Sequence, residues 1–226
     1  MATHTLEADS IIKIFGTRTL LSDCWVSCKT GEILGLIGRN GCGKSTLLKI
    51  IFGTTDALNK NVRIDGKTYQ SAFASNNHIA YLPQDGYLPK SIGVEKLIDV
   101  YLEDQSVRQH IKAHPRIQPC LKLKCGELSG GTIRILEILL VMHLDVKFVL
   151  LDEPFNGVEP IYVDEIMELL NTYRETKGFI ITDHNFREVI TVCDKIILLH
   201  EGVCKYIKSL HDLERYNYVP SGTFDE

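Results

Sequence analysis

Long apolar runs are missing from this sequence of 226 residues. None approaches the roughly 20 consecutive apolar residues of a membrane-spanning helix, and the start, MATHTLEADS, lacks the apolar stretch of a secretory signal peptide. Blocks of basic residues are missing too, since the net charge is -4 and the charges are spread along the chain. That balance disfavours nucleic acid as the main partner. We therefore expect a soluble chain that is not exported.

Cysteine pairs of the metal-binding kind are also missing. The seven cysteines form an odd set without a C-x-x-C motif. Neither Cys24 with Cys28 nor Cys120 with Cys125 has zinc-type spacing with a second matched pair. We expect reduced thiols, as in a cytosolic protein. His110 and His114 are i and i+4 neighbours without a carboxylate or cysteine close by, so we assign no metal to them.

What the sequence does contain is a series of short apolar segments that alternate with helix-length ones, and 44% of its residues are apolar. The apolar segments predict strands, with a hairpin at the Asp65-Gly66 turn; the expected strands are 8–15, 24–32, 32–38, 61–69, 78–84, 146–154, 177–184, 195–202 and 203–209. Helices are expected at 44–53, after 131 and at 160–175, and a polar helical stretch at about 90–124. This alternation predicts an α/β fold with a mostly parallel sheet covered on both faces.

One glycine-rich segment has the pattern of a phosphate-binding loop. GRNGCGKST, residues 38–46, fits G-x-x-x-x-G-K-[ST] between an expected strand and an expected helix, which is the context that pattern requires. Backbone N–H groups of such a loop surround phosphate oxygens, and the helix N-terminus adds partial positive charge. Lys44 would reach the β- and γ-phosphates, Ser45 would offer its hydroxyl to Mg²⁺, and Thr46 would support the α-phosphate. The remaining candidate nucleotide contacts in the loop are Gly38, Asn40, Gly41, Cys42 and Gly43. Cys42 is a small spacer, and the helix N-terminus would lower the pKa of its thiol.

Two acids follow the apolar segment FVLLDE. Asp152 ends an expected buried strand, where an ionised carboxylate is costly unless a cation or hydrogen bonds satisfy it. We interpret Asp152 as a residue that holds Mg²⁺ through water. Glu153, one position further, points elsewhere and is the candidate to polarise the water that attacks the γ-phosphate.

A second helix start also has the residues to meet a phosphate. LSGG, residues 128–131, offers Ser129 as a helix cap and two glycines, Gly130 and Gly131, for close backbone approach. Taken together, the phosphate loop, the acid pair and LSGG closely resemble the motifs of the ATP-binding subunit of ABC transporters. The resemblance covers nearly the whole chain. In that family, LSGG binds the γ-phosphate held by the other subunit of a head-to-tail dimer.

The resemblance also implies roles for three other residues. Phe15 matches the aromatic residue that stacks on adenine, although a turn or core aromatic residue is the plainer interpretation. Gln84 in YLPQD matches the glutamine that touches Mg²⁺ and relays contact with the membrane subunit. His184 in ITDHN matches the histidine that contacts the γ-phosphate. The implied catalytic residues are therefore Glu153, His184 and Gln84, and the implied metal site comprises Ser45, Gln84 and Asp152.

The resemblance further implies one ABC ATPase domain over residues 1–226: a P-loop core, an antiparallel β subdomain and a short helical subdomain at 89–131. Its cofactors would be ATP and Mg²⁺. Its partners would be a second copy, as a homodimer, and an integral-membrane subunit that holds it at the cytoplasmic face, so that its own membrane contact is indirect. The runs DEPFNGVEP and DHNFRE are similar to those of the lipopolysaccharide-export ATPase group.

Several positions depart from the family pattern. Thr132 replaces the usual Gln or Glu after LSGG, Ile133 and Ile135 replace charged or polar residues, and Glu159 replaces an Asp. The segment between Gln84 and Ser129 is short for the family. Within 90–126 the basic residues outnumber the acids, which is typical of a solvated face. Two alternatives stay open: a soluble ABC-type ATPase of an assembly or repair complex, and a catalytically silent module that senses ATP by dimerising.

Overall fold

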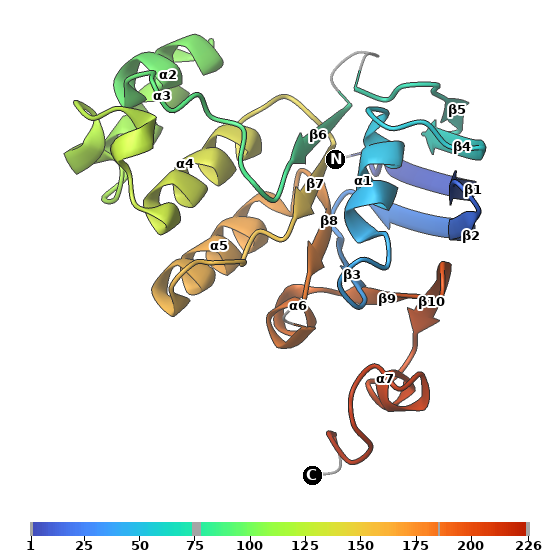
Figure 1. Ribbon diagram of the computed structural model, residues 1–226. Helices are drawn as coiled ribbons and strands as arrows, with labels where there is room; N and C mark the ends of the chain where they lie inside the picture. The colour runs from blue at the N-terminus through green and yellow to red at the C-terminus, as the bar shows by residue number, and fades with distance from the viewer. Residues whose placement is uncertain (1, 74–77, 185, 225–226) are drawn as a thin grey trace.

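The computed structural model describes residues 2–73, 78–184 and 186–224. Its centre is a six-stranded sheet in the order β10-β9-β3-β8-β7-β6 (Figure 1). Neighbouring strands run parallel from β9 to β6, and only β10 is antiparallel. The strands are β3 (Ile33–Ile37), β6 (Ile79–Leu82), β7 (Phe148–Asp152), β8 (Gly178–Asp183), β9 (Lys195–His200) and β10 (Val203–Ile207). Every residue of β3, β7 and β8 is buried, as expected of parallel strands covered on both faces.

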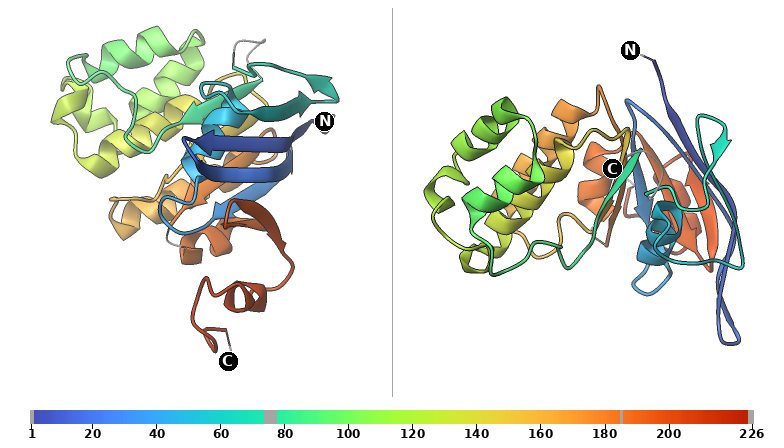
Figure 2. Two further views of the ribbon diagram at one scale, coloured as in Figure 1. Left: turned by 45° about the vertical axis from the view of Figure 1, so that its right-hand side comes forward. Right: turned by 90° about the horizontal axis from the view of Figure 1, so that it is seen from above.

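A second, antiparallel sheet lies over one face of the first, and helix α1 (Lys44–Phe52) packs between the two sheets. Its order is β2-β1-β4-β5, with β1 (Thr5–Phe15), β2 (Arg18–Lys29), β4 (Asn59–Ile64) and β5 (Lys67–Thr68). Helix α1 contributes Leu47, Leu48, Ile50 and Ile51 to a core shared with residues of both sheets. The second view in Figure 2 shows this sheet and the helices of residues 94–142 on opposite sides of the parallel sheet.

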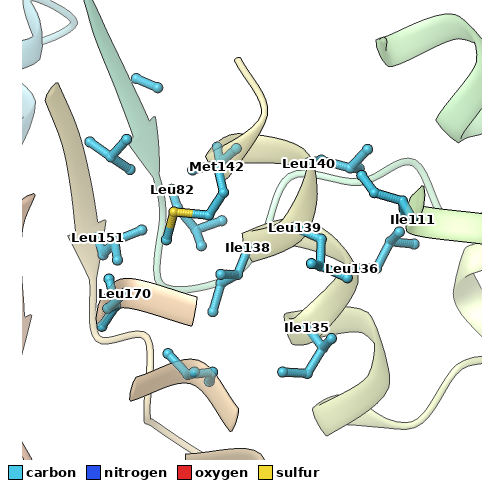
Figure 3. Close-up of a cluster of buried hydrophobic side chains, with 14 of the residues drawn as sticks. Leu82, Ile111, Ile135, Leu136, Ile138, Leu139, Leu140, Met142, Leu151 and Leu170 are labelled. Atoms are coloured by element: carbon cyan, nitrogen blue, oxygen red, sulfur yellow. The ribbon is translucent and has the colours of Figure 1, made fainter. Parts of the chain in front are cut away.

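The other face of the parallel sheet carries the remaining large helices. These are α2 (Val94–Tyr101), α3 (Gln105–Ala113), α4 (Gly130–Met142) and α5 (Pro160–Tyr173), with 3-10 turns at Gln118–Cys120 and Cys125–Glu127. Helix α4 is apolar nearly all round, and its buried side chains pack against both the strands and α3 (Figure 3). A helix that is hydrophobic all round is a buried helix, which explains why Ile135 stands where a polar residue was expected: its side chain is fully buried.

Some of the basic residues at 90–126 pair with acidic neighbours. Lys112 lies within 3.2 Å of Glu95 and 2.8 Å of Asp99, and Arg116 donates to Glu165 at 2.8 Å. The expectation that His114 has no carboxylate nearby is wrong, because Glu165 on α5 lies 3.2 Å from its Nε2 atom. That acid is distant in the sequence, so only the packing of α5 on the helical segment reveals it.

The expected strands and the long helices are present, although β2 begins at Arg18, six residues before its expected start. Two short helices were not expected: α6 (Phe186–Val192) and α7 (His211–Arg215). Helices this short depend on tertiary packing, and their sequences carry little periodic signal. Within the described residues, we find no helix whose length and apolarity would let it cross a membrane.

Candidate functional site

The candidate residues gather at one edge of the parallel sheet. The phosphate loop follows β3, His184 follows β8, Asp152 ends β7, and Gln84 comes two positions after β6. These four strands are consecutive neighbours in the sheet and parallel, so their carboxyl ends share one edge. Ligands of open α/β sheets bind outside such carboxyl ends. The topology therefore explains why residues more than a hundred positions apart meet here.

The phosphate loop leaves a helix N-terminus open to an anion. Gly43 caps α1 with φ 113°, a left-handed conformation that suits glycine, and a Cβ atom there would approach Leu21 to 3.0 Å. No side chain of the residues that the structure describes caps this end, and the first turn of α1 has no acid. The first N–H groups of a helix have no partner within the helix, so this end fits a phosphate. Lys44 is buried, and its Nζ atom donates to the Gly38 carbonyl at 2.8 Å.

A cavity of about 600 Å³ extends from this helix end. Ligand pockets generally measure about 300–1,000 Å³, so its size fits a nucleotide. The cavity brings together predicted residues from four segments and two residues that were not predicted, Leu20 and Asn156. The predicted residues that line it are Asn40, Gly41, Gly43, Lys44, Ser45, Thr46, Gln84, Glu153 and His184.

Asp152 is buried beside the cavity and surrounded by hydroxyl groups. Its Oδ1 atom accepts hydrogen bonds from Ser45 Oγ at 3.0 Å and Thr182 Oγ1 at 2.7 Å, and its Oδ2 atom accepts one from the Tyr81 hydroxyl at 2.8 Å. Burial, and then the Asp152 charge, raise the pKa of Tyr81 well above its usual value, so the phenol stays protonated and donates. A carboxylate and a serine hydroxyl 3.0 Å apart are the hard oxygen donors that Mg²⁺ prefers.

Glu153 has an unusual backbone. Its φ is 47°, in the left-handed region that non-glycine residues rarely adopt. Such strain persists only where the surroundings enforce it; here the Glu153 N–H donates to the Thr182 carbonyl at 2.9 Å. The side chain is nearly buried, and its Oε2 atom accepts from Asn156 Nδ2 at 3.1 Å and lies 3.7 Å from His184 Nδ1. The strained turn therefore places Glu153 in the cavity beside His184.

Arg134 connects α4 to this edge of the sheet. Its buried guanidinium donates to the carbonyls of Asp152 at 2.9 Å, Glu153 at 3.0 Å and Pro83 at 3.0 Å. It also pairs with Glu137 at 3.2 Å, and the other Glu137 oxygen accepts from the Tyr87 N–H at 2.9 Å. We did not predict this network. The signal in the sequence is two opposite charges, i and i+3, inside an otherwise apolar helix.

The structure does not bring every predicted residue to the cavity. Phe15, at the end of β1, is 55% exposed and lies under Lys13, whose Nζ atom is 4.8 Å from the ring centroid; it is not among the residues that line the cavity. Gly38 contributes through its carbonyl to Lys44. Cys42 also lies outside the lining, and the expectation for its thiol is wrong: burial raises its pKa, and this effect exceeds that of nearby Lys44.

Residues 129–131 also lie outside the lining of the cavity. Ser129 caps α4 as expected, accepting from the Thr132 N–H at 3.2 Å while its hydroxyl donates to Thr132 Oγ1 at 2.9 Å. The two glycines differ. A Cβ atom at Gly131 would lie 2.5 Å from the Tyr162 ring of the same chain, whereas one at Gly130 would meet no atom of the described residues within 4 Å. Packing within the chain therefore requires glycine at position 131 but not at position 130.

Comparison with known proteins places these features in a family. The family model described as "ABC transporter" matches residues 21–156. The chain is 31% identical over 221 residues to the lipopolysaccharide export system ATP-binding protein LptB of Escherichia coli (strain K12), covering 88% of each chain. It is 32% identical over 222 residues to a probable ABC transporter ATP-binding protein of Azorhizobium caulinodans, covering 89% of this chain and 76% of the relative.

Solved structures have the same fold. An ATP-binding subunit of an ABC transporter is similar with a TM-score of 0.82 and 23% identity, covering 97% of this chain and 96% of that one. A nucleotide-free ATP-binding cassette from an ABC transporter is similar with a TM-score of 0.81 and 21% identity, covering 96% of each chain. At these identities, the likeness concerns the fold.

Proposed function

The chain belongs to the ABC transporter family, and from this premise we propose that two copies form a head-to-tail dimer whose ATP-driven closure works a membrane subunit. Family membership confirms the resemblance seen in the sequence, the P-loop ABC fold, ATP hydrolysis as the activity, and ATP and Mg²⁺ as cofactors. ATP-binding subunits of this family dimerise and work with membrane transporter subunits. The homodimer, the residue roles and the particular partner are our proposals.

The observation that carries the dimer is the position of residues 129–131. The helix start at Ser129 is not part of the lining of its own chain's cavity, and the space around Gly130 is open. A helix N-terminus with open space around its first residue suits an anion from outside the chain. We infer that this anion is the γ-phosphate of ATP bound to the other copy.

Within each site, we assign the following roles. Lys44 and the N-terminus of α1 bind the phosphates, and Glu153 accepts a proton from the attacking water and orients it for in-line attack. His184, 3.7 Å from Glu153, holds that geometry, and Phe15 stacks on adenine. Bound Mg²⁺, held through Ser45, Gln84 and Asp152, would supply positive charge beside the phosphates. The strained backbone of Glu153 supports its role, because such strain gathers at active sites.

We also propose where the membrane subunit binds. A cavity of about 280 Å³ lies between the sheet and the helical segment, lined by aromatic residues that include Phe73 and Tyr101. Phe73 is 46% exposed and Tyr101 36%, and neighbouring Val100 is 75% exposed. Exposed apolar patches mark interaction sites, and a membrane subunit of the lipopolysaccharide-export type is the occupant that we infer. The chain would then lie at the cytoplasmic face of the membrane.

The domain organisation supports the same proposal. We treat residues 1–226 as one ATPase domain in which 89–131 is a helical insertion. Leu97 of α2 and Ile111 of α3 share one core cluster with Leu82 and Leu151 of the sheet. An insertion joined to the sheet by a continuous core can transmit movement between the nucleotide and the partner.

The Glu153→Gln variant tests the function. Gln keeps the size of the side chain but cannot accept the proton, so we expect ATP binding to persist while turnover falls by about 10²–10⁴-fold, as is usual for a lost general base. ATP should then trap a dimer, measured by size-exclusion chromatography with ATP, together with a phosphate-release assay. The double variant Lys44→Ala/Glu153→Gln is the control and should stay monomeric. Unchanged turnover in Glu153→Gln would refute the role of Glu153. Absence of phosphate release from the wild type would favour the silent module.

The identity of the partner separates the transporter from the other alternative. Purification of the native complex in detergent should recover a protein with several membrane spans. A soluble partner in its place would favour an assembly or repair ATPase.

A further inference from the structure

The side chain of Asp152 is held at both of its oxygen atoms. Ser45 and Thr182 both donate to Oδ1. For Oδ2, the hydroxyl of Tyr81 is the donor that the described residues provide, at 2.8 Å. A carboxylate fixed at one oxygen can still turn about its side-chain bonds, whereas bonds to both oxygens define its plane. The bond from Tyr81 therefore completes the set of hydrogen bonds that orients Asp152.

The sheet register explains why residue 81 has this role. Tyr81 on β6 lies opposite Leu150 on β7, two positions before Asp152. Side chains alternate between the faces of a sheet with period two, so Leu150 and Asp152 project toward the same face. That face packs on α1, since Leu150 and Leu47 belong to one core cluster, against which Tyr81 also packs. Ser45, at the start of α1, therefore lies on the same side of the sheet as Tyr81 and Asp152.

The ring and the hydroxyl of Tyr81 have separate surroundings. The ring lies 5.5 Å from the Phe52 ring and forms part of the wall of the 280 Å³ aromatic cavity. The hydroxyl reaches past this apolar layer to the carboxylate. Phenylalanine at this position would keep the ring packing and remove only the hydrogen bond.

We propose that Tyr81 is a positioning residue for the metal site: its hydroxyl orients the Asp152 carboxylate toward Mg²⁺. The inference rests on the proposed role of Asp152 as a residue that holds the metal. Groups that orient metal-holding side chains usually change metal affinity by about 10–100-fold when removed. The Tyr81 hydroxyl is such a group, one layer away from the cation.

The test compares Tyr81→Phe with Tyr206→Phe. Tyr206 is also half-buried and its hydroxyl also makes one described hydrogen bond, from the Ser27 N–H at 3.2 Å, but it lies on β10, away from the site. Mn²⁺ binding is measured by electron paramagnetic resonance on protein saturated with a non-hydrolysable ATP analogue. Affinity for the analogue is measured separately in EDTA, and thermal unfolding reports folding.

We expect Tyr81→Phe to weaken Mn²⁺ binding by about 10-fold or more, and to leave analogue affinity in EDTA and the unfolding temperature close to those of Tyr206→Phe. Mn²⁺ affinity close to that of the wild type would overturn the inference, and so would an equal loss of analogue affinity in EDTA, which indicates a structural role.

Asp152→Asn separates this inference from the function on which it rests. If Asp152→Asn weakens Mn²⁺ binding and Tyr81→Phe does not, only the role of Tyr81 fails. If Asp152→Asn keeps the wild-type affinity, the proposed metal site itself fails. In the Asp152→Asn background, Tyr81→Phe should cause no further loss if it acts through Asp152. A further loss of Mn²⁺ affinity in the double variant would overturn the inference. This comparison holds even if Tyr81→Phe lowers the unfolding temperature.

Discussion

Lys177 is a buried charge outside the nucleotide site. It follows α5, is 7% exposed, and its Nζ atom donates to the carbonyls of Leu144 at 2.7 Å and Val146 at 3.0 Å. Burial lowers the pKa of Lys177 to about 8. The two carbonyls, between α4 and β7, partly replace the water that the ammonium loses. Among the described residues, no carboxylate lies in ion-pair contact with it. Its charge is therefore tolerated at some cost.

This lowered pKa predicts how stability depends on pH. Between pH 8 and the unfolded value of 10.5, the unfolded state binds a proton that the folded state has lost, so the Lys177 contribution to the free energy of unfolding increases with pH. The slope cannot exceed about 1.4 kcal/mol per pH unit for one proton. Urea unfolding at several pH values gives the free energy of unfolding of the wild type and of Lys177→Met. The difference between these free energies, as a function of pH, measures the Lys177 contribution. The exposed Lys122→Met is the control and should run parallel to the wild type. Parallel curves for Lys177→Met as well would contradict the prediction.

At the scale of one element, the N-terminus of α4 separates two roles of glycine. Gly131→Ala would push a Cβ atom to 2.5 Å from the Tyr162 ring, whereas Gly130→Ala would meet nothing within 4 Å in the described part of its own chain. Overpacking usually costs about 1–3 kcal/mol, and we expect that loss in the free energy of unfolding for Gly131→Ala only. Urea unfolding of the two matched variants measures it. In a Tyr162→Ala background the loss should disappear; a loss that persists there would show that Tyr162 is not its cause.

The strands and long helices were predictable because each carries its own local pattern. The strand β7 is a continuous apolar run, and the loop before α1 has fixed glycines. The helices α6 and α7 were not predictable, because seven and five residues give too few turns for a clear periodic pattern and their stability comes from packing on the sheet.

The candidate site divides in the same way. Lys44, Ser45, Asp152 and Glu153 stand in local motifs that carry their chemistry, and the sheet topology then brings them together. The roles of Tyr81 and Arg134 were not predicted, because each residue stands within an apolar element of the sequence. Their roles come from contacts with strands that are distant in the sequence. The thiol of Cys42 was misjudged because desolvation, which depends on the folded surroundings, outweighs the local helix end.

At the scale of the whole molecule, a shared site makes a prediction about mixtures. Lys44→Ala should abolish binding at a chain's own phosphate loop. Gly130→Asp should fold, because the space beside Gly130 is open, but should repel the phosphate of the other copy. Mixed dimers of the two variants contain one intact site, so mixing should restore up to about a quarter of the wild-type activity if pairing is random. Phosphate release from each variant alone and from the mixture measures this. No recovery on mixing, with both variants folded and mixed dimers present, would contradict the shared site. Wild-type phosphate release from Gly130→Asp alone would mean that each chain encloses its own nucleotide.

Arg134 gives this pair of chains a mechanical property. One guanidinium fastens the α4 backbone of a chain to the carbonyls of Asp152 and Glu153 in that chain. In the proposed dimer, the N-terminus of α4 contacts the nucleotide of the other chain. The Arg134 side chain of the same helix holds the Asp152–Glu153 turn, which faces the nucleotide of its own chain. Helix α4 would then be coupled to both ATP molecules, so hydrolysis of one ATP would change how tightly the other is bound.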